Sequence, residues 1–338
     1  MRDFAHPLAT EGRWLKHLPR LEWERDMNVR ILIILVVMIA MPNFAQEQIS
    51  SDGVPVHMVV TVEATHGKEI PQLQREDVIV LQGKDRLRLT EWTTLQGEQA
   101  GLELFVLVDD ASADSLGVQL ADVREFINAQ PASTSIGIGY MRDDVTAIAQ
   151  DLTTDHTLAA KSLRLPLGRI SVGASPYLAL SNLIKKWPRS AVRREVLMIS
   201  SGVDLLGEFG PTNPYLDAAI EQAQRAGMIV YAIYAPSAGH SGHSFWRMNW
   251  GQNFLGELAE ETGGEAYMLG FGPPVSLAPY LREVAESLNH QYSATFVAKP
   301  PAKPGWVSVR YTTEVPNAEI VAPRKVWVSK PPLSGKDH

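Results

Sequence analysis

The sequence predicts an α/β fold, namely a doubly wound, mostly parallel sheet flanked by helices and inserted in a small β-sandwich of N- and C-terminal strands. Three observations lead to this prediction. The middle of the 338-residue chain alternates short apolar runs with helical patterns, an order typical of parallel sheets. Residues 102–108 (LELFVLV) are apolar without a break, as in a strand buried on both faces. The segments before and after this middle block have β patterns instead.

The strand at 102–108 is followed by a predicted helix at 116–129 and a second strand at 134–141. Residues 145–149 are expected to form an antiparallel edge strand, and 196–199 a buried one. Further helices are expected at 156–163, 177–186 and 277–290. Asp155 is a plausible N-cap of the first of these helices, and Ser175 with Pro176 gives the second a strong start.

Short β-rich runs flank the middle block. They lie at 56–62, 77–82 and 88–92 before it, and at 292–298, 306–311 and 325–329 after it. Because isolated hairpins are barely stable in water, we expect the two sets to pair into one module. The predicted domains are a start extension with a signal peptide (1–45), an N-terminal β module (46–97), the α/β domain (98–291), a C-terminal β segment (292–330) and a tail (331–338).

The N-terminal region has the order of a secretory signal peptide. A short basic start at 27–30 precedes an apolar run at 31–41 and the small residue Ala45. Eleven apolar residues reach only about 16 Å as a helix, about half of a hydrocarbon core of roughly 30 Å. We therefore expect cleavage near Ala45, a secreted or periplasmic location, and no transmembrane span in the mature chain. Residues 1–26 are interpreted as an over-long gene start, with a long signal-peptide start as the alternative.

Composition excludes several classes of protein. Hydrophobic residues make up 45% and charged residues 20%, which is ordinary for a globular chain and excludes wholesale disorder. The net charge of −7 and the lack of a basic stripe give no nucleic-acid footprint. With no cysteine, the chain has no disulfide, thiolate nucleophile or thiolate zinc site. The sequence also lacks Gly-x-Ser-x-Gly, P-loop and His-Glu-x-x-His motifs, so we do not expect an enzyme.

Several short segments follow one another in a recognisable order. Two aspartates follow the first strand, Gly173-Ala174-Ser175 opens a helix, Ser200-Ser201-Gly202 follows a buried strand, and LAEETGG (258–264) ends a helix. In this order and spacing, residues 102–291 resemble a von Willebrand factor type A (VWA) domain. The flanking segments resemble those of VWFA-related secreted proteins of Acidobacteria-type bacteria. The resemblance implies protein binding, in adhesion or envelope interaction.

The VWA resemblance implies a metal-ion-dependent adhesion site (MIDAS), for which the family uses Asp-x-Ser-x-Ser, a Thr and a second Asp. With Asp109 as the first aspartate, alanines stand at both serine positions, and Ser175 and Ser201 replace the Thr and the Asp. A frame shifted by one residue uses Asp110 and Ser112 instead, with Asp204 as the third-loop carboxylate. The apolar run ends at Val108, which favours Asp109. The candidate metal ligands are Asp109, Asp110, Ser112, Ser175, Ser201 and Asp204. We expect no cofactor, or a weakly bound Mg²⁺ or Ca²⁺.

A Gly/Ser-rich loop with aromatic residues, at 237–250, follows the predicted penultimate strand of the α/β domain at 228–233. Its candidate partner-binding residues are His240, His243, Phe245, Trp246 and Trp250, of a kind that protein interfaces favour. As the alternative, Trp246 or Trp250 plugs the edge of the sheet. The two histidines could ligate a transition metal only with a third ligand that the sequence does not offer.

The sequence thus favours a secreted or periplasmic VWA-type module with a degenerate MIDAS that binds an unidentified protein. Two alternatives remain. One is a metal-dependent hydrolase on a similar sheet. It would need a general base near Asp109, which His240 or His243 would have to supply. The other is a purely structural envelope protein without a ligand site.

Overall fold

The computed structural model describes residues 53–67, 69–96, 101–168, 174–190, 192–207, 210–239, 244–268, 270, 272 and 275–329. The predicted start extension, signal peptide and tail lie outside these residues. No helix in the described ranges is long and apolar enough to cross a membrane.

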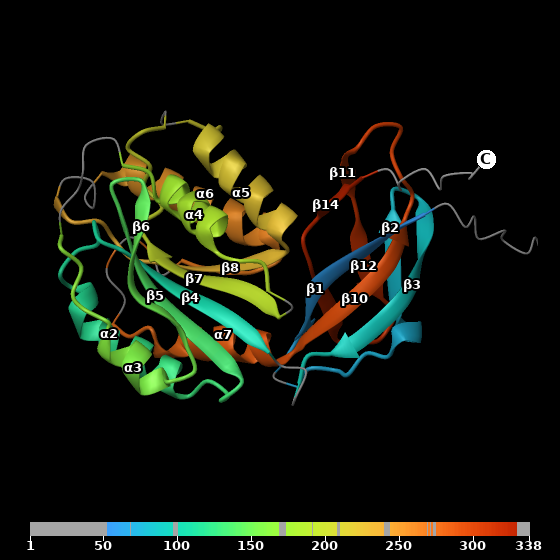
Figure 1. Cartoon of the computed structure of the whole chain (residues 1–338), viewed down its shortest axis with the longest axis horizontal. Coiled ribbons are helices and arrows are strands. Elements are labelled where there is room, and N and C mark those ends of the chain that lie inside the picture. The colour runs from blue at the N-terminus through green and yellow to red at the C-terminus, as the bar shows by residue number, and fades with distance from the viewer. Residues whose placement is uncertain are drawn as a thin grey trace, which may run out of the picture. The chain divides into compact units, whose positions relative to one another are not determined.

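The α/β part contains an open sheet of six strands (Figure 1). They are β4 (Leu102–Asp109), β5 (Thr134–Arg142), β6 (Val145–Thr153), β7 (Arg193–Ser200), β8 (Met228–Tyr234) and β9 (Ala266–Tyr267). The strand order is β6–β5–β4–β7–β8–β9, so the chain enters at the centre, winds to one edge, and then fills the other side. β5 and β6 pair antiparallel, whereas the other neighbours in this sheet are parallel. The predicted edge strand at 145–149 is therefore confirmed and extends to Thr153.

Helices cover both faces of this sheet, as the doubly wound prediction requires. They are α2 (Leu116–Asn128), α3 (His156–Lys161), α4 (Pro176–Lys186), α5 (Pro214–Ala226), α6 (Phe245–Thr262) and α7 (Ala278–Asn289). Figure 1 shows α2, α3 and α7 on one face and α4, α5 and α6 on the other. Each set packs on its own apolar cluster, because successive strand side chains point to opposite faces.

Two predicted helix starts are confirmed in atomic detail. The Asp155 carboxylate accepts a hydrogen bond from the Leu158 amide at the start of α3. The Ser175 hydroxyl accepts one from the Leu178 amide, and Pro176 occupies the first turn of α4. These side chains satisfy amide groups that a helix start leaves without partners.

The β part contains strands from both ends of the chain. They are β1 (Val54–Ala64), β2 (Val78–Gln82), β3 (Asp85–Thr94), β10 (Gln291–Ala298), β11 (Gly305–Ser308), β12 (Arg310–Thr313), β13 (Ala318–Val321) and β14 (Lys325–Val328). One sheet has the order β12–β2–β3–β10–β1–β13, and β11 pairs with β14 in a second. β1 runs antiparallel to β10, with Val56 opposite Phe296. An apolar cluster joins side chains from these early and late strands.

The prediction of a single strand at 306–311 is wrong. The segment divides at Val309, because β11 pairs with β14 whereas β12 pairs with β2 in the other sheet. The Val309 amide bonds to the Arg324 carbonyl between these two ladders. Strand β13, which pairs with β1, was not predicted from the sequence.

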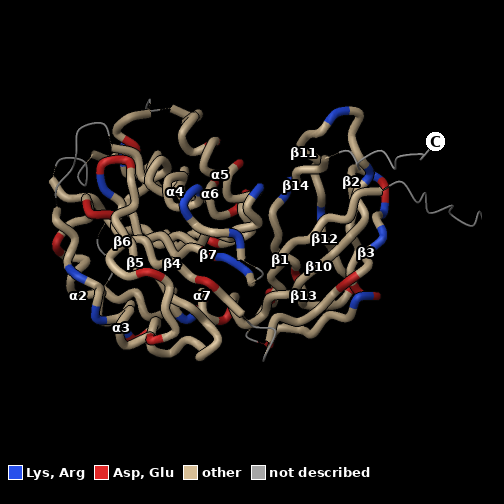
Figure 2. Tube along the Cα trace, viewed as in Figure 1, with Lys and Arg blue, Asp and Glu red and all other residues tan. Residues whose placement is uncertain are grey.

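Lysine and arginine residues are interspersed with aspartate and glutamate along the described chain (Figure 2).

Helix α6 lies very close to the loop that follows β7. A Cβ atom placed on Gly251 of α6 would lie 2.3 Å from the Ser201 carbonyl oxygen. A Cβ on Gly202 would lie 2.2 Å from the Gly251 carbonyl oxygen, and Gly202 also has a φ of +65°. Glycine at both positions therefore permits this contact between helix and loop.

We predict that Gly251→Ala destabilises the protein by about 1–3 kcal/mol, because the new methyl group overlaps backbone that cannot move aside. The matched control is Gly256→Ala in the same helix, where an added Cβ meets no atom within 4 Å. That control should be neutral or gain up to about 1 kcal/mol from helix propensity. Chemical denaturation of the two variants checks this, and equal effects would contradict the close packing.

A buried carboxylate makes stability depend on pH. Burial raises the pKa of Glu195 on β7 to about 7, against the opposing effect of the Arg193 guanidinium. The closest nitrogen–oxygen distance between the two groups is 3.9 Å. Since the pKa in the folded state lies above the value of 4.5 for an exposed glutamate, the folded chain holds this proton to higher pH. The protonated Glu195 side chain therefore contributes to the unfolding free energy at low pH, and this contribution is lost as pH rises from about 4.5 through 7.

We predict that Glu195→Gln flattens the dependence of unfolding free energy on pH. Between pH 5 and pH 8, the wild type should lose up to about 3 kcal/mol more than the variant. Denaturant titrations across this range measure the difference, and Glu125→Gln on the exposed side of α2 serves as the control. Parallel pH profiles of wild type and Glu195→Gln would refute the assignment.

Candidate functional site

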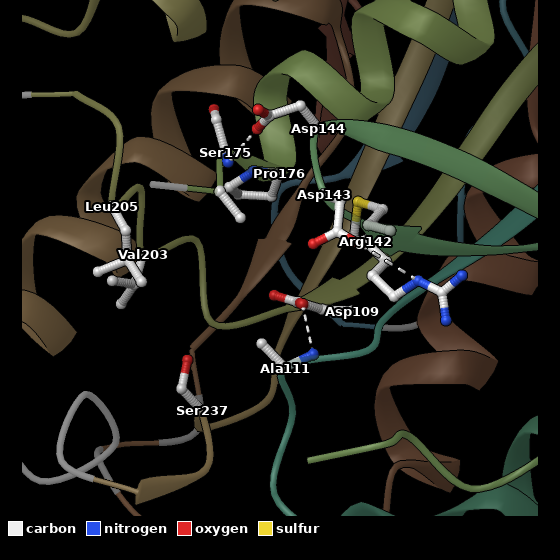
Figure 3. Close-up of a pocket in the computed structure, with 12 residues that line it drawn as sticks. Asp109, Ala111, Arg142, Asp143, Asp144, Ser175, Pro176, Val203, Leu205 and Ser237 are labelled. Carbon is white, nitrogen blue, oxygen red and sulfur yellow. Dashed lines mark hydrogen bonds and ion pairs between the residues drawn. The ribbon is translucent and has the colours of Figure 1, made fainter. Parts of the chain in front are cut away.

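A small pocket lies at the carboxyl ends of the parallel strands, where open α/β sheets bind ligands. Its volume is about 40 Å³. Figure 3 shows side chains from several loops around it. The lining residues are Asp109, Ala111, Met141, Arg142, Asp143, Asp144, Ala174, Ser175, Pro176, Val203, Leu205 and Ser237.

Asp109 ends the central strand β4 and is only 7% exposed. One carboxylate oxygen, Oδ2, accepts a hydrogen bond of 2.7 Å from the Ser200 hydroxyl. The other, Oδ1, accepts one of 2.9 Å from the Ala111 amide. Burial raises the pKa of Asp109 above its usual range, and the two hydrogen bonds oppose this shift. The carboxylate is thus held by neutral donors from two loops.

Asp110 forms a separate contact. Its carboxylate makes two hydrogen bonds to the Arg164 guanidinium, at 2.6 and 2.7 Å, and the side chain is 1% exposed. The guanidinium lies 3.6 Å from the centre of the Tyr140 ring. Of the two aspartates, only Asp109 lines the pocket. Ser112 is fully buried and also lies outside the lining.

Ser175 and Asp204 bond to each other and not to Asp109, although Ser175 lines the same pocket as Asp109. The Ser175 hydroxyl donates to Asp204 Oδ2 at 2.8 Å. The same carboxylate accepts bonds from the side chain of Asn213 and from the amides of Leu206 and Gly207. Asp204 is 4% exposed and fixes the loop between β7 and α5.

Ser201 contacts a different partner from the other predicted ligands. The Ser237 hydroxyl donates to the Ser201 hydroxyl at 2.6 Å, and Ser237 lines the pocket. Of the six candidate ligands, Ser175 and Asp204 bond to each other, whereas Asp109, Asp110 and Ser201 each bond to a different side chain. In the described part of the chain, no three His, Asp or Glu side chains are placed to hold a metal ion. A divalent cation prefers about six oxygens, so this arrangement does not fit one well.

Sequence reasoning missed the contribution of the turn between β5 and β6. Asp143 and Asp144, which were not among the candidate site residues, line the pocket. Asp144 Oδ1 accepts a hydrogen bond of 2.7 Å from the Ser175 amide. Both aspartates have positive φ, 49° and 63°, in a two-residue hairpin that usually favours Asn-Gly. This unusual Asp-Asp at the end of a strand was the available signal.

The predicted partner-binding residues separate into exposed and packed ones. Phe245 and Trp246 begin α6 and are 55% and 72% exposed, with ring centres 5.9 Å apart. Trp250 is half-buried, packs on the core, and lies 5.8 Å from the Phe254 ring. Of the two tryptophans, Trp250 therefore takes the packing role and Trp246 faces solvent. His240 and His243 lie outside the described residues.

No family model and no curated protein matches the chain. Solved structures show similarity at low identity. An aerotolerance-related membrane protein from Bacteroides fragilis is 14% identical over 56% of this chain and 99% of its own, with a TM-score of 0.43. The SpRpn10 VWA domain is 13% identical over 54% and 94%, with a TM-score of 0.38. The ArnB paralog VWA2 from Sulfolobus acidocaldarius is 9% identical over 83% and 75%, also at 0.38. Likeness at this level says nothing about the function of the chain.

We predict that Asp144→Ala destabilises the protein by about 2–3 kcal/mol. The change removes a charged acceptor from the Ser175 amide and leaves alanine at positive φ. Asp144→Asn is the matched control, because asparagine keeps an acceptor oxygen and tolerates positive φ. Thermal denaturation should rank wild type and Asp144→Asn together, well above Asp144→Ala. A similar loss in both variants would mean that the hydrogen bond has no stabilising role.

Proposed function

We propose that this chain is a secreted or periplasmic VWA-type module that binds a protein partner without a metal ion. The observation that carries the proposal is the pair Phe245–Trp246, exposed 55% and 72% on the helix that follows β8. Large aromatic side chains are costly to expose and are enriched among residues that dominate binding energy. They also lie after the carboxyl end of a parallel strand, the side of an open sheet that binds ligands.

Metal independence is supported by the bonds within the site. Asp110 is paired with Arg164, and Asp204 accepts four hydrogen bonds from its own loop and its neighbours. Asp109 is the carboxylate left at the pocket among the predicted ligands. A cation that bound there would have to compete with the Ser200 hydroxyl for it.

Binding is favoured over catalysis by the chemistry of the pocket. Among the described residues that line it there is no histidine, glutamate or lysine. A hydrolase needs a positioned general base beside its nucleophile or activated water. The Asp109 carboxylate already accepts two hydrogen bonds from the protein, which favours a role in holding loops together.

The pairing of the β strands suggests how the α/β domain is connected to the rest of the chain. We propose that the early and late β segments form one β-sandwich module in which the α/β domain is an insertion. The antiparallel pairing of β1 with β10 and of β2 with β12 supports this arrangement. Export through the signal peptide at 27–45 is proposed on the sequence alone.

The test is capture from envelope extracts of the native cells by the immobilised mature chain, with cross-linking and identification of the captured protein. We predict that replacing Phe245 and Trp246 by alanine lowers capture of one defined partner at least tenfold. Their exposure means that the melting temperature should hardly change. EDTA should leave capture by the wild type unaffected.

The matched control is Leu158→Ala, which removes a comparably exposed apolar side chain from α3. This variant should capture the partner as the wild type does. Loss of capture with EDTA, copied by Asp109→Ala, would replace the metal-free proposal with a working MIDAS. Equal capture by wild type and double variant would reject the aromatic surface.

A further inference from the structure

The carboxylate at the end of β4 is an unusual feature of the pocket. Asp109 is only 7% exposed, yet it takes part in none of the ion pairs among the described residues. Its two hydrogen-bond donors, Ser200 and the Ala111 amide, are neutral. Figure 3 shows the carboxylate directed into the space between Ser175 and Ser237. A buried anion without a counter-ion is costly and is best stabilised by a cation.

The pocket has room for a small cationic group. Its volume of about 40 Å³ compares with about 10–15 Å³ for one water molecule on the same measure. Apolar side chains form much of the wall, contributed by Ala111, Ala174, Pro176, Val203 and Leu205. A hydrocarbon stem would pack on this wall while a polar head group reaches Asp109.

The hydroxyl groups beside Asp109 add acceptors. Ser237 donates its proton to the Ser201 hydroxyl, so the lone pairs of its own oxygen remain for a ligand. The Ser175 hydroxyl donates to Asp204 and accepts from the Leu178 amide, which leaves one lone pair of its oxygen for a ligand. An ammonium group has three donors and no acceptor, which matches one carboxylate and two hydroxyl oxygens.

Other ligands match this pocket less well. An anion, such as the carboxylate that completes a MIDAS, would meet three aspartates and one arginine in the lining when no metal is bound, and Arg142 is paired with Asp143. Mg²⁺ demands near-ideal six-fold oxygen coordination, and Ca²⁺ takes six to eight oxygens.

We propose that this pocket receives the ammonium group of a lysine side chain from the partner protein. The proposal rests on the protein-binding function proposed above and names the partner group that enters the site. The aromatic pair supplies apolar contact area, and Asp109 selects for positive charge. The partner therefore presents a positive charge to this pocket, whereas the ligand of a MIDAS presents a negative one.

The test uses the mature chain and the blocked peptide acetyl-Gly-Lys-Gly-amide, whose only ammonium is on the lysine. Matched peptides carry norleucine or Nε-acetyllysine in its place. Titrations followed by ligand-observed NMR should give a dissociation constant at least tenfold lower for the lysine peptide than for either control. Addition of 10 mM MgCl₂ at constant ionic strength should not displace it.

Two variants locate the binding. Asp109→Asn should weaken lysine-peptide binding at least tenfold, whereas Asp114→Asn, an exposed aspartate of the same loop, should not change it. If Asp109→Asn fails to fold, Ala111→Leu decides, because it fills the pocket and leaves Asp109 in place. This second variant should also abolish binding.

Equal binding of the lysine and norleucine peptides, or wild-type affinity in a folded Asp109→Asn or Ala111→Leu variant, would overturn the ammonium site. Displacement of the peptide by Mg²⁺ would overturn it as well and would assign the pocket to a metal. None of these results would alter partner capture through Phe245 and Trp246. Failure of the peptide test and failure of the proposed function are thus separate outcomes.

Discussion

The hydrogen bond between Ser200 and Asp109 is the interaction on which the rest of the site depends. It joins the ends of the adjacent strands β7 and β4 at 2.7 Å in a buried position. Burial of a carboxylate costs several kcal/mol unless donors compensate it, so this bond makes the buried Asp109 tolerable. The Ser200 hydroxyl also accepts a bond from the Gly202 amide, which fixes the turn that follows β7. That turn places Gly202 against Gly251 and so positions α6.

The exposed aromatic pair is a consequence of this geometry. Helix α6 is held by its close contact with the turn and by the apolar side chains of Phe254, Leu255 and Leu258. Its first residues, Phe245 and Trp246, are 55% and 72% exposed. The α/β part therefore combines an internally bonded polar pocket at the carboxyl ends of its strands with an exposed aromatic pair at the start of α6. Rigid presentation of aromatic side chains limits the entropy lost on binding.

Much of the fold could be predicted because local signals and burial agree. The unbroken apolar run of β4, the capping residues Asp155 and Ser175, and the helical spacing of α7 all lead to the observed elements. The break at Val309 could not be predicted, because the two halves of the segment pair with strands that lie far apart in sequence. Alternation of side chains alone does not contain that information.

The site was harder to predict for the same reason. The pairing of Asp110 with Arg164 spans 54 residues, and Ser200 stands beside the serine that matches the family position. Motif spacing identifies which loops meet, since parallel strands bring their carboxyl ends to one edge. It does not identify which side chains bond to one another once they meet. Asp144 was overlooked because its bond to the Ser175 amide appears only when hairpin and helix are placed together.

Crystallography can decide whether Asp109 is held by the protein itself or by a divalent metal. Crystals of the mature chain soaked in millimolar Mn²⁺ would be measured for anomalous scattering. We expect no anomalous peak within about 2.6 Å of the Asp109 carboxylate, and an intact hydrogen bond from Ser200 to Asp109. A peak coordinated by Asp109 together with Ser175 or Ser237, with the Ser200 bond broken, would contradict this expectation.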